Sequence, residues 1–444
     1  MVTRAVVRGP PGLPLVGNLF QLAEGPLEFF TLIARDYGDV GTWRVGRRIV
    51  HGISDPALIE KILVQHAGSF VKDPITRRLT DVLGNGLVTA EGDAWKTGRR
   101  RMGPAFQREQ LSHYADLMVD STESWVDGVR SGDRIALHPA MGQLALEIVV
   151  RTLFGAKPNA KLREVGETVG VLMHSFEHYL RSWQRLLPDA LLGPARRKIH
   201  RQSEKLNAVL MEIVRERRAS PERGNDVLSR LLDARDEDGA MTDAQLRDEA
   251  ITIFVAGHET TALALTFALY LLGWHPAERE AIAREARAVL GGRTATYTDL
   301  PQLVRTKAAL QEAMRLYPPV YAMGREAIEE VDLGAVVLPK GAIVLMAQWV
   351  VHRDPRWYRD PEVFRPERWL DHSLDGNPKF AYFPFGGGPR VCIGSHFAMM
   401  EAVLVLATIA RHLDWTNDEV PDLSLATAVT LRPTTPLSAR FERR

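Results

Sequence analysis

The sequence predicts a mainly helical protein with a small β part, an α+β fold that forms a single domain over residues 1–444. Apolar residues recur at helical spacing along most of the chain, whereas β-like runs are short and few. No internal repeat, linker or low-complexity tract divides these segments. A chain in which 45% of the residues are hydrophobic and 25% are charged has the composition of a globular protein with a large core.

The elements follow in a clear order. After a turn-rich entry at residues 8–14, β-like runs are expected at 40–45 and 48–52. We expect helices, in chain order, at 28–37, 56–65, 95–107, 110–131, 139–154, 164–187, 193–218, 226–234, 242–274, 276–290 and 395–413. We expect further strands at 331–337, 342–346 and 428–432. Thr242 and Gln245 have the spacing of a capping box at the start of the longest helix, which would be about 50 Å long.

Charge and cysteine content exclude several classes of protein. The net charge is +1, which gives no reason to expect nucleic acid or an anionic membrane as a partner. One cysteine excludes a disulfide framework and suits a reducing cytosol. The N-terminal residues lack the apolar core of a signal peptide, so we expect a cytoplasmic protein.

The longest apolar stretch, residues 251–274, raises the question of a membrane span. It carries His258, Glu259, Thr260 and Thr261 in its middle, and a lipid-facing helix would not tolerate these without partners. We therefore expect a buried helix through the centre of a large domain and no membrane span.

The single cysteine, Cys392, lies in the sequence FGGGPRVCIG at residues 385–394. This glycine-rich loop leads into the apolar helix expected at 395–413, so Cys392 stands just ahead of a helix N-terminus. The partial positive charge there favours a thiolate over a thiol. A thiolate flanked by glycines, which let the backbone approach closely, is what an axial ligand of haem iron requires.

These ten residues match the signature Phe-x-x-Gly-x-Arg-x-Cys-x-Gly at every fixed position, and the whole chain resembles the cytochrome P450 superfamily. The resemblance implies a soluble bacterial haem-thiolate monooxygenase whose haem b is ligated by Cys392. It also implies the cytochrome P450 fold, with the haem between a long central helix and the cysteine loop. The loop residues expected around the cofactor are Phe385, Gly388, Arg390, Cys392 and Gly394.

Four residues resemble the groups that bind the haem propionates in this family. Trp95 and Arg99 are four residues apart on one helix face, where an indole N–H and a guanidinium can donate to one carboxylate. A solvated surface helix is the alternative for this arginine-rich segment. Arg390 and Arg325 resemble two further propionate contacts.

Glu312 and Arg315 match the family's Glu-x-x-Arg motif, on a helix that the following prolines end. Most such pairs are solvated and stabilise a helix by only about 0.2–0.5 kcal/mol. Arg368 lies in the sequence PERW, which resembles the segment whose arginine joins the pair. We therefore predict a buried ion triad with a structural role.

The sequence AGHETT at residues 256–261 resembles the family's oxygen-activation motif. Ala256 and Gly257 are expected beside the haem, with a local helix distortion near Thr260; close helix packing is the alternative reason for the glycine. The resemblance assigns Thr260 and Glu259 to the delivery of protons to dioxygen.

The substrate pocket should be built from apolar residues with no fixed pattern, which makes the substrate hydrophobic. A terpenoid, a fatty acid and a polyketide or macrolide all remain open, and several of these side chains are alternatively ordinary core. The residues expected to line the pocket are Met173, Phe176, Phe254, Val320, Tyr321 and Met323.

The chain carries no segment that fits a flavin or nicotinamide module. We therefore expect electrons from a separate ferredoxin or flavodoxin and an NAD(P)H reductase. Lys96, Arg100 and Arg101 are candidates for the docking patch of an acidic partner, with a solvated helix face as the alternative.

Two further functions stay open. The first is a haem-thiolate enzyme that uses or rearranges a peroxide, which the Glu259–Thr260 pair argues against because such enzymes often lack it. The second is a non-catalytic haem-binding protein. A zinc site is excluded by one cysteine and no paired histidine spacing.

Overall fold

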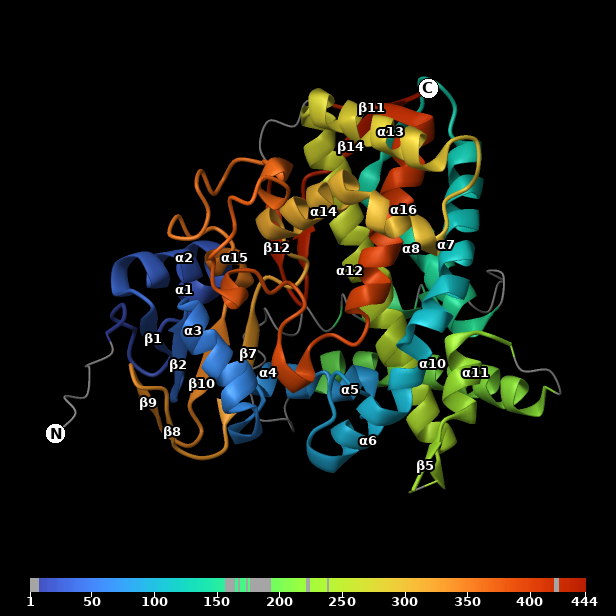
Figure 1. Cartoon of the computed structure of the whole chain (residues 1–444). Helices are drawn as coiled ribbons and strands as arrows, with labels where there is room; N and C mark the ends of the chain where they lie inside the picture. Colours follow the sequence, from blue (N-terminus) through green and yellow to red (C-terminus); the bar gives the residue numbers. More distant parts are fainter. Residues whose placement is uncertain are drawn as a thin grey trace. The chain divides into compact units, whose positions relative to one another are not determined.

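The computed structural model describes residues 8–155, 164–166, 168–172, 175, 193–220, 224–237, 239–418 and 423–444 (Figure 1). The chain divides into two compact units, and each is described by itself. The first unit contains Met1–Arg77, Gln311–Cys392 and Val429–Arg432. The second contains Arg78–Leu310, Ile393–Ala428 and Pro433–Arg444.

A five-stranded sheet organises the first unit. Its strand order is β1-β2-β10-β7-β3, and all neighbours are antiparallel except β2 and β10, which are parallel. These strands are β1 (Val40–Val45), β2 (Arg48–Ile53), β10 (Ile343–Met346), β7 (Met323–Ala327) and β3 (Phe70–Lys72). The amphipathic helix α2 (Pro26–Tyr37) packs Phe29, Phe30 and Ile33 against Trp43 and Val50 of the sheet.

Short elements complete the first unit around a second apolar cluster that includes Ile59, Ile62 and Val344. They are α1 (Leu19–Glu24), α3 (Pro56–Glu60), β8 (Val331–Asp332), β9 (Val337–Leu338) and α15 (Gln348–Val351). Helix α3 continues into a π-helical turn, Lys61–Gln65, closed by the bond from the His66 N–H to the Lys61 carbonyl.

Helix α12 (Asp243–Trp274) runs through the second unit and is buried over most of its length. Thr242 caps it, and the reciprocal bonds with Gln245 form the predicted capping box. Figure 1 shows α12 beside α8 (Leu137–Phe154) and α16 (Ser395–His412), which pack against it. The other helices that build this unit are α6 (Gly92–Met102), α7 (Arg108–Gly128), α10 (Gly193–Ala219), α11 (Val227–Asp233) and α13 (Pro276–Leu290).

The remaining elements are short or lie at the ends of larger ones. A three-stranded antiparallel sheet of the second unit has the order β11-β14-β4, from β11 (Leu413–Asn417), β14 (Ser438–Arg443) and β4 (Arg134–Ala136). The others are α4 (Pro74–Arg78), α5 (Thr80–Leu83), β5 (Arg235–Asp236), β6 (Gly239–Ala240), α14 (Val304–Leu316), β12 (Leu425–Thr427) and β13 (Leu431–Pro433). Short 3-10 turns occur at residues 67–69, 103–106, 297–302, 366–369, 379–381 and 388–390.

The predicted α+β class is confirmed, with differences in detail. The run 331–337 is two strands, because Gly334 turns the chain at φ 86° and its N–H donates to Asp332. The run 428–432 is replaced by β12 and β13, on either side of a turn. Helix 95–107 ends at Met102, and Pro104 lies in a 3-10 turn instead. Most of the expected helix 164–187 lies outside the described residues.

Within the described part of the chain, α12 alone is long and apolar enough to cross a membrane. Its most apolar window is 61% buried inside the protein. The core helix of a soluble protein passes the same test of length and composition, so this feature is weak evidence for a span.

Candidate active site

The loop that carries Cys392 is closed by its own backbone in the first unit. The Cys392 N–H donates to the Phe385 carbonyl at 3.0 Å, and the Val391 N–H donates to the Gly388 carbonyl at 3.1 Å. Cys392 itself is exposed. Gly394 follows as the N-cap of α16. The loop therefore has a defined shape and leaves the sulfur accessible to a ligand.

Close backbone contacts explain why this loop needs glycines. Gly388 has φ 66°, and a Cβ at this position would collide with the carbonyl oxygen of Leu63 in the π-helical turn. A Cβ at Gly386 would lie 2.9 Å from the Cε of Met323 on β7. The cysteine loop is thus seated between the π-helical turn and Met323. The π-helical turn was not expected from the sequence, which reads there as ordinary helix.

Two arginines expected at the propionates lie in this unit. Arg390 ends the short 3-10 turn Gly388–Arg390 and is partly exposed. Arg325 is on β7, next to Gly324, and its Nη1 donates to the Gly324 carbonyl at 2.8 Å. Their role toward a cofactor stays a prediction.

The structure contains the expected ion triad, and all three side chains are buried. Arg315 donates to both oxygens of Glu312 at 2.9 and 2.8 Å, and the Arg368 Nε donates to Glu312 Oε1 at 2.9 Å. Burial alone would raise the pKa of Glu312, but the bonds and charges of Arg315 and Arg368 outweigh it and lower that pKa. The carboxylate is therefore held ionised inside the protein.

The network around Glu312 is larger than the sequence indicates. The Trp369 Nε1–H donates to Glu312 Oε2 at 2.9 Å, and the Arg365 backbone N–H donates to Oε1 at 3.0 Å. Arg315 lies over the ring of Tyr358, 4.9 Å from its centroid. Trp369 directly follows Arg368, so the complete sequence PERW was a signal for this contact.

In the second unit, the AGHETT segment is a partly exposed stretch in the middle of α12. Phe254 and Thr261 are buried. Between them, Ala256 is exposed and the other five residues are partly exposed. The Thr260 hydroxyl donates to the Ala256 carbonyl at 2.5 Å, and the helix is continuous there. The expected distortion near Thr260 is therefore absent, because this i to i−4 bond accommodates the threonine within a regular helix.

Two residues of the motif face α8. His258 Nε2 lies 3.1 Å from the carbonyl oxygen of Gly142, within hydrogen-bond distance. A Cβ at Gly257 would meet Val149 at 3.5 Å, which is an ordinary contact. Close packing between these helices therefore does not require glycine at 257.

Helix α6 carries Trp95 and Arg99, both partly exposed, one turn apart as expected. Lys96 and Arg100 are exposed, and Lys96 pairs with Asp93 at 3.1 Å. Arg101 is only 6% exposed, so its place in a docking patch is corrected: one further residue rotates the side chain by about 100° around the helix, into the protein.

The expected substrate pocket is only partly described. Phe254 is fully buried, with its ring centroid 6.5 Å from that of Phe154, which makes it a core residue rather than an accessible lining residue. Val320, Tyr321 and Met323 are partly exposed; Tyr321 and Met323 also pack on the apolar clusters of the first unit. Met173 and Phe176 lie outside the described residues.

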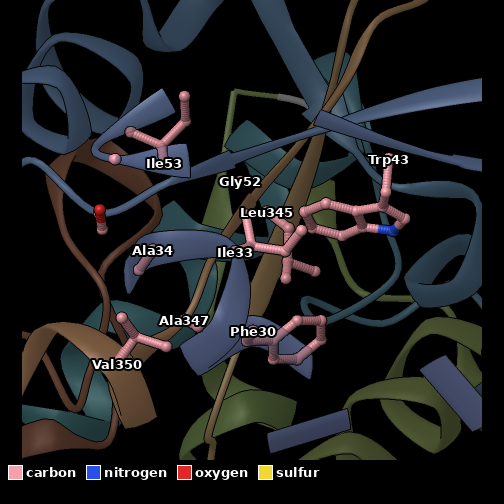
Figure 2. Close-up of a pocket in the computed structure, with 11 residues that line it drawn as sticks. Phe30, Ile33, Ala34, Trp43, Gly52, Ile53, Leu345, Ala347 and Val350 are labelled. Carbon is pink, nitrogen blue, oxygen red and sulfur yellow. The ribbon is translucent and has the colours of Figure 1, made fainter. Parts of the chain in front are cut away.

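A small pocket is present between α2 and the five-stranded sheet (Figure 2). Its lining is apolar and includes Phe30, Ile33, Trp43 and Leu345. None of the predicted site residues lines it. We assign it to imperfect packing of a helix on a sheet and not to the active site.

Known proteins match this chain along nearly its whole length. A family model for cytochrome P450 matches residues 7–441, which include both units. Cyclooctatin synthase from Streptomyces melanosporofaciens is 33% identical over 440 residues, 97% of this chain and 93% of that protein. Cyclooctat-9-en-7-ol 5-monooxygenase from the same organism is 31% identical, over 94% of this chain and 90% of that protein.

Two further matches come from another relative and from a solved structure. Pentalenene oxygenase from Streptomyces avermitilis is 32% identical, over 93% of this chain and 91% of that protein. The retinoic acid-bound cyanobacterial CYP120A1 has a TM-score of 0.87 and 26% sequence identity, over 100% of both chains.

Proposed function

Since this chain belongs to the cytochrome P450 family and is a haem-thiolate monooxygenase, we propose that it oxidises a terpenoid, inserting one atom of O₂ into a C–H or C=C bond. The observation that carries the substrate class is the similarity to two oxygenases whose names specify cyclooctat-9-en-7-ol and pentalenene, both terpenoid compounds. These relatives favour a terpenoid over a fatty acid, polyketide or macrolide, and a place in secondary metabolism.

The residues of this chain fit a haem held by a cysteine thiolate. Cys392 is the only cysteine, and it is exposed at the end of a loop that its own backbone closes. Ala256 is exposed in a helix that is otherwise largely buried, which leaves room for a flat group beside α12. When bound, the haem would supply the activation of O₂, one atom of which enters the substrate. Trp95, Arg99, Arg325 and Arg390 are proposed to donate to its propionates.

The chain's own contribution to the reaction is the movement of protons. The Thr260 hydroxyl, which donates to Ala256 here, can rotate about χ1 and donate instead to a water or to dioxygen beside the helix. The Glu259 carboxylate is partly exposed and can carry a proton from solvent to that hydroxyl or water. We assign these two residues the catalytic roles.

Electrons are proposed to come from a separate ferredoxin or flavodoxin with its NAD(P)H reductase. The protein is proposed to work in the cytoplasm, with residues 1–444 acting as one functional domain. The family match across both units supports the single domain.

The test is turnover of the haem-loaded protein with NAD(P)H, a surrogate ferredoxin and its reductase, and a panel of cyclic terpenes, fatty acids and macrolactones. We expect one class, the terpenes, to shift the ferric spin state and to yield a product with one labelled oxygen from isotopically labelled O₂. Oxidation of only fatty acids or macrolactones would contradict the substrate class.

The same assay separates the alternatives. A peroxide-using enzyme would form product from hydrogen peroxide as efficiently as from NAD(P)H and O₂. A non-catalytic haem-binding protein would consume no NAD(P)H above background with any substrate of the panel.

A further inference from the structure

The segment Gly84 to Ala90, with the sequence GNGLVTA, is fastened to α12 by two consecutive carboxylates; we call it the 84–90 strap. The backbone N–H of Asn85 donates to Asp248 Oδ2 at 2.9 Å. The backbone N–H of Leu87 donates to Glu249 Oε2, also at 2.9 Å. Both carboxylates are buried. The bond from Leu87 to Glu249 is buried as well, whereas the bond from the exposed Asn85 to Asp248 is partly buried.

The strap approaches α12 so closely that its glycines are required. A Cβ at Gly84 would collide with the Asp248 carboxylate, and a Cβ at Gly86 would collide with Thr252 Oγ1. The Thr89 hydroxyl donates to the Gly84 carbonyl at 2.6 Å and holds the turn of the strap together. The sequence of the strap is therefore suited to docking its backbone on this part of α12.

Glu249 also contacts α6. A Cβ at Gly98 would lie 3.0 Å from Glu249 Oε1, and Gly98 stands between Trp95 and Arg99 in the sequence. Glu249 is 5% exposed. One buried carboxylate thus joins α12, the strap and the helix that carries two proposed propionate ligands.

The strap lies at one end of the open face of α12. Glu249, Ile253, Ala256 and Thr260 are spaced by four, three and four residues, so they share one helix face. Ile253 and Thr260 are partly exposed and Ala256 is exposed, whereas Glu249 is covered. Glu249 and Ala256 are seven positions apart, which corresponds to about 10 Å along the helix. A ligand beside Ala256 would therefore have the strap as its neighbour along α12.

We propose that Asp248 and Glu249 are positioning residues that hold the 84–90 strap closed at this end of the face and thereby limit how fast a hydrophobic ligand enters and leaves. The inference rests on the proposed function, because it takes the Ala256–Thr260 face as the substrate side. Loss of the Glu249 carboxylate leaves the buried Leu87 N–H without this acceptor, which favours an opened strap.

The direct test is amide hydrogen exchange, read by mass spectrometry on the haem-loaded protein. Glu249→Leu is expected to raise the exchange rate of peptides covering residues 84–90 about tenfold, with α13 peptides unchanged as an internal control. Glu249→Gln keeps an acceptor oxygen for Leu87 and is expected to stay within about twofold of the unaltered protein. Unaltered exchange of the strap in Glu249→Leu would overturn the proposal.

A ligand measurement then links the strap to entry and exit. Phenylimidazole, which binds haem iron with a spectral shift, is released into a trap in a stopped-flow experiment. Release is expected about tenfold faster from Glu249→Leu and nearly unaltered from Glu249→Gln. Equal release rates from all three proteins would refute a gating role.

If Glu249→Leu does not retain haem, Asp248→Ala takes its place. This variant removes the Asn85 acceptor and also the carboxylate that accepts from its helix neighbour Arg247; the Leu87 bond to Glu249 is kept. The expected effect is faster exchange at the N-terminal part of the strap. Neither measurement requires turnover. The strap proposal can therefore fail while the terpenoid monooxygenase assignment holds, and the reverse is also possible.

Discussion

Glu401 lies on α16 within an apolar environment, and burial raises the pKa of its carboxyl group well above the ordinary range. It is 2% exposed, and its Oε1 has no hydrogen-bond partner among the described residues. One turn earlier on the helix, Phe397 packs against Tyr114 of α7. Burial therefore favours the neutral form of the Glu401 carboxyl group, and within the described part of the chain no ion pair offsets this effect.

This burial makes stability depend on pH. From about pH 4 upward, the unfolded chain releases the Glu401 proton while the folded chain keeps it, so stability falls as pH rises toward the folded pKa. Glu401→Gln removes this effect. Between about pH 4 and the folded pKa of Glu401, the unfolding free energy of Glu401→Gln minus that of the unaltered protein should increase by about 1.4 kcal/mol per pH unit.

Urea unfolding of both proteins at pH 5.5 and pH 8, followed by circular dichroism, measures this difference. Glu442→Gln, on an exposed position of β14, is the matched control and should show a constant difference. A Glu401→Gln difference that does not change with pH would mean that the acid ionises in the folded protein.

Thr260 gives the second prediction at this scale. Thr260→Ala removes the hydroxyl proposed to direct protons, and the helix is not expected to suffer because alanine is the better helix former. The yield of product per NAD(P)H should fall at least about tenfold, with hydrogen peroxide released instead.

The measurement is the ratio of NAD(P)H consumed to product and peroxide formed. Thr260→Ser keeps the hydroxyl and should recover most of the coupling. Full coupling in Thr260→Ala would remove this residue from the proposed mechanism.

Among the elements, α14 and the 3-10 turn Pro366–Trp369 are joined by the Glu312 network. Both oxygens of Glu312 accept more than one bond, and both guanidinium partners are buried. Glu312→Ala would leave two buried cations without their anion, at a cost of about 3–5 kcal/mol. We expect little haem-loaded protein from this variant.

Asp36→Ala is the matched control in the same unit, because Asp36 pairs with Arg35 at 2.6 Å and both side chains are exposed, at 42% and 69%. An exposed pair contributes about 0–1 kcal/mol, so expression and haem content should be nearly unaltered. The measurement for both variants is the amount of haem per protein, taken from the pyridine haemochrome spectrum. Normal loading of Glu312→Ala would show that the network is dispensable.

How far the sequence predicts each element depends on where the partner of a residue lies. The shape of the cysteine loop was predictable because the left-handed φ of Gly388 is a local requirement for glycine, and the ion triad because buried charges require opposite charges. Asp248 and Glu249 were missed because their partners are backbone N–H groups more than 160 residues away, which leave no pattern in side-chain types. Phe254 was misplaced because core and pocket select the same apolar residues.

For the whole molecule, the family match covers both units, although their internal structures differ: a sheet with small helices in one and long packed helices in the other. The sequence predicted the family from Cys392 and its neighbours alone. Substrate class came instead from the relatives, because apolar pocket residues encode shape through their arrangement and not through their identity.

The last prediction concerns the electron donor, whose docking is a property of the whole surface. Lys96 and Arg100 are exposed one turn apart on α6, and the corrected patch consists of these two residues. Reversing both charges (Lys96→Glu with Arg100→Glu) should raise the KM for an acidic ferredoxin about tenfold at low salt, and less at physiological ionic strength, because salt screens exposed charges. Arg359→Glu, 87% exposed in the other unit, is the control for charge reversal alone and should leave KM nearly unaltered. An unaltered KM in the double variant at low salt would mean that this face of α6 is solvated and that the partner docks elsewhere.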